Sequence, residues 1–217
     1  MKKIIIFDLD GTILDTIIDL TNAVNYAMQM CNYPTHTSDE VKCMVGNGIK
    51  NLIKRAMPQG YLEDAFIEFF SYFKSYYEEH TYDYTKPYDG ILEVLERLKS
   101  EGYLLAIASN KADFAVKKLS RHFFGNLFYA SLGAKEGFAL KPNKAIIDEI
   151  LNMSDSEYQA IYVGDSEVDI LTASNAGIPC ISVTWGFREE EALRNNGATV
   201  IARTPEELYE KINSNNI

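Results

Sequence analysis

Hydrophobic residues near the N-terminus form a short unbroken run that predicts a strand buried on both faces. Residues 4–7 read Ile-Ile-Ile-Phe, and continuous apolar runs rich in β-branched residues are typical of the inner strands of a parallel sheet. The run ends at two carboxylates, Asp8 and Asp10, which are followed by Gly11 and Thr12. Because a carboxylate that leaves water needs a cation, a metal ion or several hydrogen-bond donors, this pair marks a candidate site.

Helical periodicity replaces this pattern over residues 16–84. Apolar positions recur every three or four residues in successive stretches, which are separated by turn residues such as the Gly46-Asn47-Gly48 sequence. The predicted helices span residues 16–31, 38–45, 49–57 and 61–84. The last of them is dense in Phe and Tyr, which we interpret as core packing.

Strands and helices alternate through the rest of the chain. The predicted strands span residues 103–108, 127–132, 159–163, 178–183 and 199–202. The predicted helices span residues 90–100 and 167–176, with others ending near 122, beginning at Pro142 and following Pro205. Such alternation indicates a parallel sheet with helices on both faces, joined by right-handed crossovers. We therefore predict an α/β, Rossmann-like core of residues 1–14 and 86–217, with an inserted α-helical cap of residues 15–85.

Composition and charge narrow the range of partners. The 217 residues carry a net charge of -10 without a long basic block, which argues against nucleic acid or an anionic membrane as partner. No apolar stretch could cross a bilayer, and the N-terminal run is too short for a signal peptide. The cysteines are odd in number and lack metal-ligand spacing, which indicates a reducing compartment; they are Cys31, Cys43 and Cys180. We expect a cytoplasmic protein, and the sequence predicts no oligomeric state.

Polar residues also follow two later strands. The sequence Ser109-Asn110-Lys111 comes after the predicted strand at 103–108, and an acidic segment, residues 165–169, comes after the strand at 159–163. The carboxyl ends of parallel strands meet at the same edge of a sheet. We therefore expect both segments to lie beside the N-terminal pair of carboxylates.

The residue types at this edge suit a metal ion and a phosphate. Hard oxygen ligands of the kind that Mg²⁺ prefers come from three carboxylates; they are Asp8, Asp10 and Asp165. Ser109 and Asn110 supply hydrogen-bond donors suited to phosphate oxygens. Lys141, next to the proline that is expected to open a helix, adds a cation that balances the negative charge.

In this order, the four clusters resemble the four motifs of the haloacid dehalogenase-like hydrolases. The resemblance is to the phosphatase branch of the family, whose first motif is Asp-x-Asp-Gly-Thr and whose helical cap follows that motif. The resemblance covers nearly the whole chain. It implies a Mg²⁺-dependent phosphatase that acts on small phosphorylated metabolites through an aspartyl phosphate. Asp10 favours a phosphate ester or anhydride as substrate, because members that cleave carbon–halogen or carbon–phosphorus bonds generally lack an acid at this position.

The resemblance also implies a role for each motif residue. Asp8 is the expected nucleophile and Asp10 the expected acid–base. Mg²⁺ is expected between the Asp8 carboxylate, the Asp10 backbone carbonyl and Asp165. Lys141 would stabilise the charge of Asp8 and of the phosphoryl group, and Asp169 would orient Lys141 or a metal-bound water. The residues expected to bind the phosphate are Ser109, Asn110 and Thr12.

Within the predicted cap, residues 45–49, followed by Leu52 and Arg55, resemble the corresponding stretch of phosphoglycolate phosphatases. The resemblance implies that the backbone of Gly46 and Asn47 approaches a small anionic substrate. It also suggests Arg55 as a partner for the substrate's carboxylate. An ordinary helix–helix turn and a solvated arginine are the alternatives for these residues.

Phosphoglycolate phosphatase-like activity is the leading hypothesis, and three others remain open. Relatives with such a turn include phosphatases of broad specificity for nucleotides, sugar phosphates or pyrophosphate. A phosphomutase resembling β-phosphoglucomutase shares the aspartyl phosphate but returns the phosphoryl group to a sugar. A phospho-accepting regulatory module also carries an acidic pocket, but has no use for a cap or for Asp10.

Overall fold

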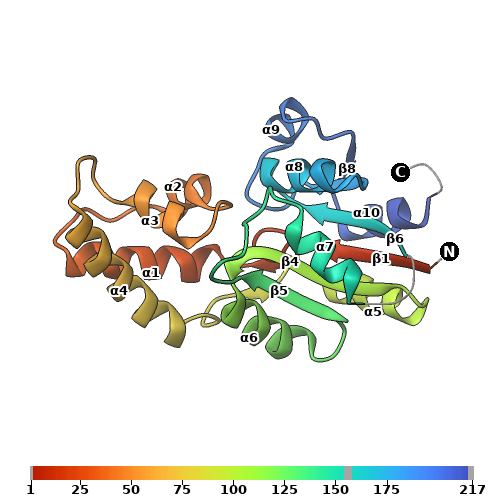
Figure 1. Cartoon of the computed structure of the whole chain (residues 1–217), viewed down its shortest axis with the longest axis horizontal. Helices are drawn as coiled ribbons and strands as arrows, with labels where there is room; N and C mark the ends of the chain where they lie inside the picture. The colour runs from red at the N-terminus through yellow and green to blue at the C-terminus, as the bar shows by residue number, and fades with distance from the viewer. Residues whose placement is uncertain (1, 154–157, 215–217) are drawn as a thin grey trace.

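A parallel β-sheet forms the centre of the protein in a computed structural model that describes residues 2–153 and 158–214 (Figure 1). Within these residues its six strands are β1 (Lys2–Phe7), β4 (Leu104–Ala112), β5 (Ala130–Ala134), β6 (Tyr158–Gly164), β7 (Cys180–Val183) and β8 (Val200–Ala202). Their order is β5-β4-β1-β6-β7-β8, and all neighbours are parallel. Because β1 lies between β4 and β6, the three strands that precede the predicted polar clusters are neighbours.

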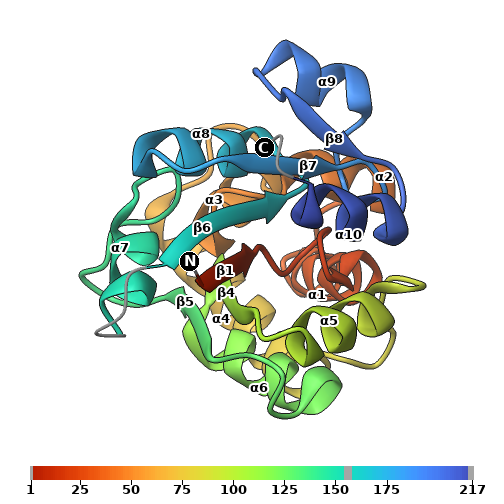
Figure 2. The ribbon, with the colours of Figure 1, turned by 90° about the vertical axis from the view of Figure 1, so that its right-hand side faces the viewer.

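Both faces of the sheet are covered by helices, as the apolar run in β1 predicts (Figure 2). Ile5 and Phe7 belong to an apolar cluster with α5 (Ile91–Ser100), α6 (Asp113–Phe124) and α10 (Pro205–Asn213). Ile4 and Ile6 point the other way, into a cluster with α7 (Ala145–Asn152) and α8 (Glu167–Ala176). Successive residues of a strand point to opposite faces, so a strand buried on both sides needs no polar residue before its end. The predicted α/β fold is confirmed.

The helices between β1 and α5 form a separate helical unit beside one end of the sheet (Figure 1). They are α1 (Ile17–Met30), α2 (Ser38–Met44), α3 (Ile49–Ala56) and α4 (Glu63–Glu79). These helices pack around an apolar cluster of their own. We call this unit the cap; its independence as a domain of residues 15–85, apart from a core of 1–14 and 86–217, stays a prediction.

Two short strands connect the cap to the sheet. β2 (Leu14–Asp15) pairs antiparallel with β3 (Lys86–Pro87), so the outgoing and returning segments lie side by side. The Asp19 carboxylate, in the first turn of α1, accepts hydrogen bonds from the backbone N–H groups of Tyr84 and Thr85. A buried carboxylate therefore fixes the base of the cap.

Several boundaries differ from those that the sequence predicts. β4 continues through an irregularity to Ala112, so Ser109, Asn110 and Lys111 belong to the strand. Pro142 does not open a helix: a turn joins the Asn143 N–H to the Leu140 carbonyl, and α7 begins at Ala145. The short helix α9 (Glu190–Asn195) was not predicted. Among the described residues, none of the helices has the length and apolar character needed to span a membrane.

Candidate active site

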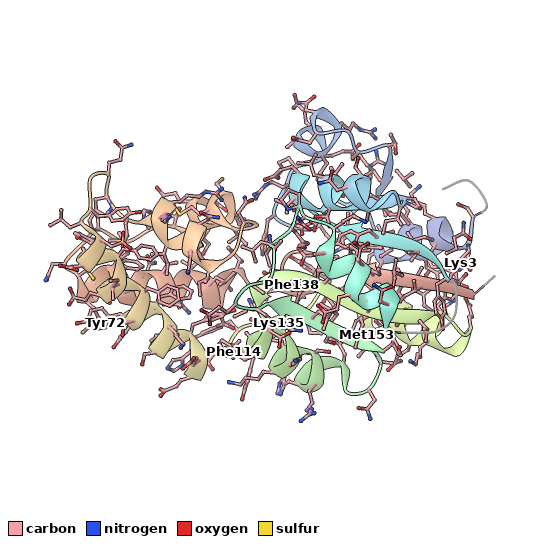
Figure 3. The ribbon with its side chains drawn as sticks, viewed as in Figure 1. Lys3, Tyr72, Phe114, Lys135, Phe138 and Met153 are labelled. Carbon is pink, nitrogen blue, oxygen red and sulfur yellow. The ribbon has the colours of Figure 1, made fainter. Side chains whose placement is uncertain are left out.

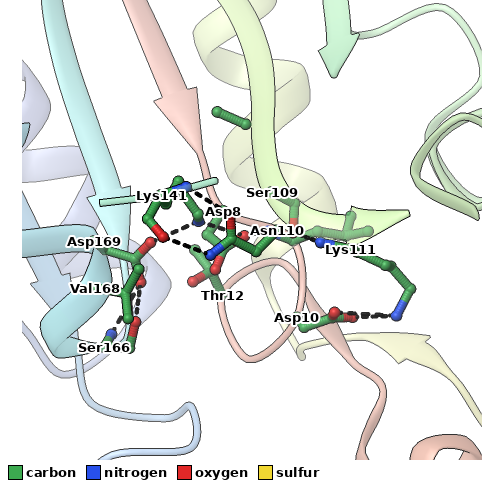
Figure 4. Close-up of polar contacts among 12 residues, drawn as sticks. Asp8, Asp10, Thr12, Ser109, Asn110, Lys111, Lys141, Ser166, Val168 and Asp169 are labelled. Carbon is green, nitrogen blue, oxygen red and sulfur yellow. Dashed lines mark hydrogen bonds and ion pairs between the residues drawn. The ribbon is translucent and has the colours of Figure 1, made fainter. Parts of the chain in front are cut away.

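Segments from separate parts of the chain meet beyond the carboxyl ends of the central strands (Figure 4). Asp8 follows β1, Ser109 lies near the end of β4, and Asp165 follows β6. These three residues line a cavity of about 580 Å³, whose other wall comes from α1, α3 and α4 of the cap. Phe114, at the start of α6, also lines it and lies on the side of α6 that faces the cap (Figure 3). The cavity therefore lies between the sheet edge and the cap.

The Lys141 ammonium forms ion pairs with two carboxylates next to this cavity. Its Nζ lies 3.0 Å from Asp8 Oδ1 and 2.8 Å from Asp169 Oδ1, and it donates to the Tyr162 hydroxyl at 2.9 Å. All four side chains are buried. Burial alone disfavours the ammonium, but the carboxylates of Asp169 and Asp8 outweigh it and raise the pKa of Lys141 well above its usual value. Lys141 is therefore a fixed positive charge beside Asp8.

Asp169 has little capacity left for a metal ion. Its Oδ1 accepts from Lys141, and its Oδ2 accepts from the backbone N–H and the hydroxyl of Ser166 at 3.1 and 2.6 Å. The contact with the Ser166 N–H is one half of a capping box at the start of α8. This geometry suits a carboxylate that orients Lys141.

Asp8 and Asp165 carry negative charge that Lys141 does not balance. Oxygens of Asp8, Asp165 and Asp169 lie within 4.8 Å of one another, and the Lys141 ammonium contacts only Asp8 and Asp169. Burial raises the pKa of Asp8 to about 6 and that of Asp165 to about 8, and the nearby carboxylates add to both shifts. A divalent cation with hard oxygen ligands relieves such repulsion. The donor set therefore fits Mg²⁺, held chiefly by Asp8 and Asp165.

Gly11 is required for the close approach of the first motif to Asp165. Its backbone φ is +82°, and a Cβ at this position would lie 2.4 Å from Asp165 Oδ2. The contact is far inside van der Waals distance, and the φ value also favours glycine. The glycine of the first motif thus brings the turn after β1 against the end of β6.

Asp10 points away from the Lys141 network (Figure 4). Its two carboxylate oxygens lie 2.8 and 3.0 Å from Lys111 Nζ. Both side chains line the cavity. The two acids of the first motif therefore have different cations as partners, although they are two residues apart.

Two residues expected to bind phosphate have other partners. The Thr12 hydroxyl donates to Asp165 Oδ1 at 3.0 Å, so it supports a carboxylate and its single hydrogen is used. The Asn110 side chain donates to the carbonyls of Lys141 and Gly46, and accepts from the Lys141 N–H. Both of its amide hydrogens are used as well. Asn110 therefore fixes the lysine loop against the cap, while Ser109 hydrogen bonds to Asp8 and faces the cavity.

The cap residues that the sequence predicts to contact substrate differ in whether they line the cavity. Gly46 lines the cavity, whereas Asn47 and Arg55 do not. The Asn47 carbonyl accepts from the side chain of Asn51, as an ordinary turn before a helix would. Arg55 is exposed, and its Nη1 donates to the Met44 carbonyl at the end of α2 at 2.7 Å. In this arrangement the guanidinium binds the end of a helix, so contact between Arg55 and a substrate carboxylate stays a prediction.

Several cavity residues received no role from the sequence, among them Lys74, Tyr77, Lys111 and Arg188. A lysine directly after Ser109-Asn110 at a strand end was a usable signal, since a buried ammonium needs a carboxylate. Tyr77 was interpreted as core packing, which its burial also supports. Arg188 pairs with Glu167 and donates to the Lys42 and Val45 carbonyls of the cap; no sequence pattern indicated this contact.

Comparison with known proteins decides the family. The sequence profile of the haloacid dehalogenase-like hydrolases matches residues 5–183. The chain belongs to this family. A phosphoglycolate phosphatase of Aliivibrio fischeri is 32% identical to this hydrolase over 208 residues, which are 92% of each chain. A phosphoglycolate phosphatase of Vibrio parahaemolyticus is 31% identical over 218 residues, 97% of this chain and 96% of the relative.

A solved structure agrees with the sequence relatives. A protein of Lactobacillus delbrueckii subsp. bulgaricus, provisionally named a phosphoglycolate phosphatase, superposes with a TM-score of 0.92 at 35% identity, covering 98% of this chain and 99% of its own. The predictions of a haloacid dehalogenase-like fold and of a phosphatase resembling phosphoglycolate phosphatases are confirmed. The regulatory-module alternative is not favoured.

Proposed function

We propose that this phosphatase depends on Mg²⁺ and hydrolyses small phosphorylated metabolites with an anionic leaving group, as phosphoglycolate has, through an aspartyl phosphate on Asp8. The observation that carries the proposal is the buried Asp8 carboxylate, which lies 3.0 Å from the ammonium of Lys141 and faces the cavity. A carboxylate so placed is fixed in direction and can react with a group in the cavity. The cytoplasm is the proposed location, because all three cysteines are free thiols.

The side chains suit two successive displacements. Asp8 forms a bond to phosphorus as the bond to the leaving oxygen breaks, and Asp10 gives that oxygen a proton. Asp10 then takes a proton from water as the water oxygen attacks phosphorus and releases Asp8. Lys141 holds Asp8 in place and stabilises the phosphoryl charge. Mg²⁺, when bound by Asp8, Asp165 and the Asp10 backbone carbonyl, supplies a positive charge that neutralises the phosphate oxygens.

Metal binding is expected to show in thermal stability as well as in activity. The raised pKa values of Asp8 and Asp165, about 6 and about 8, mean that the folded metal-free protein binds protons more tightly than the unfolded chain. Its free energy of unfolding should therefore fall as pH rises from about 4 to about 8. Mg²⁺ replaces those protons, so the gain in Tm on adding Mg²⁺ should be larger at about pH 8 than at about pH 6.

Asp165→Asn is the variant that tests this metal site, with Tm measured by differential scanning fluorimetry. Removing one buried charge should raise the Tm of the metal-free protein at about pH 8 and abolish most of the gain from Mg²⁺. NaCl at the same ionic strength controls for screening. An equal Mg²⁺ gain in both proteins would exclude Asp165 as a ligand, and full activity in chelator would exclude the metal.

Lys74 is the cation proposed to recognise the leaving group. It lines the cavity from the same face of α4 as Phe70 and Tyr77. Its Nζ lies 3.7 Å from an exposed Glu78 carboxylate, a weak partner. By contrast, the other lysine and the arginine of the lining have carboxylate partners at 2.8 and 3.0 Å. Among the described lining residues, Lys74 is therefore the cation most available to a substrate carboxylate.

Lys74→Met should raise the KM for phosphoglycolate about tenfold, since it removes one charge-assisted contact. The kcat should change little, and the KM for 4-nitrophenyl phosphate, whose leaving group lacks a carboxylate, should stay within about twofold. Lys54→Met, at an exposed cap lysine outside the cavity lining, is the control and should leave both values unchanged. Equal rises for the two substrates would remove Lys74 from leaving-group recognition.

A phosphate-release panel tests the proposed substrate class. It should include phosphoglycolate, a nucleoside monophosphate, glucose 1-phosphate and pyrophosphate, with kcat/KM as the measure. We expect phosphoglycolate to be preferred. A preference for one of the others would indicate the broad-specificity alternative, and isomerised sugar without free phosphate would indicate a phosphomutase.

A further inference from the structure

Lys111 is buried next to the proposed acid–base. It extends from the end of β4, its side chain is 5% exposed, and its Nζ lies within 3.0 Å of both Asp10 oxygens. Burial disfavours its charge, but the Asp10 carboxylate and Tyr77 outweigh that cost, so the pKa of Lys111 lies above its usual value. The two contacts fix both oxygens of a side chain that could otherwise rotate about two bonds.

Tyr77 brings the cap to the same pair. It comes from α4, and its ring centroid lies 4.9 Å from Lys111 Nζ, within the range of a cation–π contact. Its buried hydroxyl lies beside Lys111 and helps to stabilise the ammonium, and the residue lines the cavity. Burial raises the pKa of Tyr77 to about 12, so this hydroxyl keeps its proton.

We infer that Lys111 and Tyr77 are positioning residues that hold the Asp10 side chain beside the leaving oxygen. A proton carried by one Asp10 oxygen then passes to the leaving oxygen while Lys111 holds the other Asp10 oxygen. The inference rests on the proposed function, because it needs Asp10 to act as the acid. A general acid works only within hydrogen-bond reach of the atom it protonates. Since Lys111 belongs to the sheet and Tyr77 to the cap, the arrangement is complete only when the cap covers the site and excludes water.

Two alternative roles for Lys111 do not involve Asp10. The lysine could support the local fold, or it could bind the substrate directly. Positioning of Asp10 differs from both roles in how it depends on the leaving group. Phenyl phosphate and 4-nitrophenyl phosphate share an aromatic ring, but phenolate is the stronger base and needs a proton when it leaves, whereas 4-nitrophenolate does not. The ratio kcat/KM reports the steps up to the first phosphoryl transfer, so later hydrolysis of the aspartyl phosphate does not mask the difference.

We expect Lys111→Met to lower kcat/KM about 100-fold for phenyl phosphate and only about threefold for 4-nitrophenyl phosphate. Lys111→Arg keeps a cation and should recover much of the first loss. Tyr77→Phe keeps the ring and should lose about fivefold for phenyl phosphate alone. In an Asp10→Asn background, adding Lys111→Met should cost less than about twofold, because a residue that acts through Asp10 has nothing left to position.

Lys117→Met is the matched control, since Lys117 pairs with Asp113 at 2.7 Å on the exposed side of α6; it should change neither substrate. Equal losses for the two phosphates in Lys111→Met, or an undiminished loss in the Asp10→Asn background, would overturn the inference. If Lys111→Met fails to fold, Tyr77→Phe and Lys111→Arg provide the test, through the same comparison of kcat/KM for phenyl phosphate with kcat/KM for 4-nitrophenyl phosphate. Absence of phosphate release by the wild type from these compounds and from every member of the substrate panel, phosphoglycolate included, would instead contradict the proposed function.

Discussion

Asp8→Asn should lower turnover at least about 10⁴-fold while the protein remains folded, because a neutral amide cannot form the bond to phosphorus. The substitution keeps the shape of the side chain. It also reduces the negative charge in a buried cluster of three carboxylates, of which only two contact an ammonium. The thermal stability of the metal-free protein should therefore be equal to or above that of the wild type at neutral pH. Phosphate release and circular dichroism measure the two effects.

Mass spectrometry supplies the control for Asp8→Asn. The wild-type protein, quenched in acid during turnover, should carry one added phosphoryl group on the peptide that contains Asp8, and the variant should carry none. More than about a hundredth of wild-type activity in the variant would assign the nucleophile to another residue. A phosphorylated peptide elsewhere in the chain would identify that residue.

Lys141→Met should destabilise the protein by about 3–5 kcal/mol and lower turnover at least about 100-fold. The methionine fills similar space but leaves Asp8 and Asp169 buried without their cation, which lies within 3.0 Å of both. Urea unfolding measures the free-energy difference. Because protonation removes the uncompensated charge, the loss should shrink as pH falls from about 8 to about 5.

A double variant separates the two effects of Lys141. Adding Asp169→Asn to Lys141→Met removes one unpaired charge, so much of the stability should return while activity does not. Lys144→Met is the control at an exposed ion pair, 3.0 Å from Asp148, and should cost less than about 1 kcal/mol. Stability unchanged in Lys141→Met would mean that the buried charges are already relieved in another way.

The sequence predicts where the polar strand ends meet, because burial and connectivity fix that position. An apolar run that ends in Asp8 has to place that carboxylate at a sheet edge, and alternation of strands and helices makes the other strand ends meet there. Asp165 follows the same rule at the end of β6. Asp169 stands three residues after Ser166, the spacing of a capping box.

The partner of each polar side chain is less predictable. Thr12 and Asn110 have the chemistry of phosphate ligands, yet their hydrogens go to Asp165 and to two backbone carbonyls. Arg55 lies near the turn that resembles a substrate loop, but it binds the end of α2. The residue type determines which hydrogen bonds a side chain can donate. The packing of segments distant in sequence determines which acceptor each hydrogen bond reaches. Lys111 was overlooked for the same reason, because its partner lies across the sheet edge.

The position of β1 in the sheet affects the order in which the chain can fold. Ile4 pairs with Leu104 on one side and with Ala160 on the other, so β1 gains both neighbours only after the chain has been made as far as β6. Pairings so far apart in sequence are slow to form. The helices of the cap, in contrast, pack around a cluster of nearby residues and can collapse early. The strand that leads to Asp8 is therefore made before its neighbours and completed late.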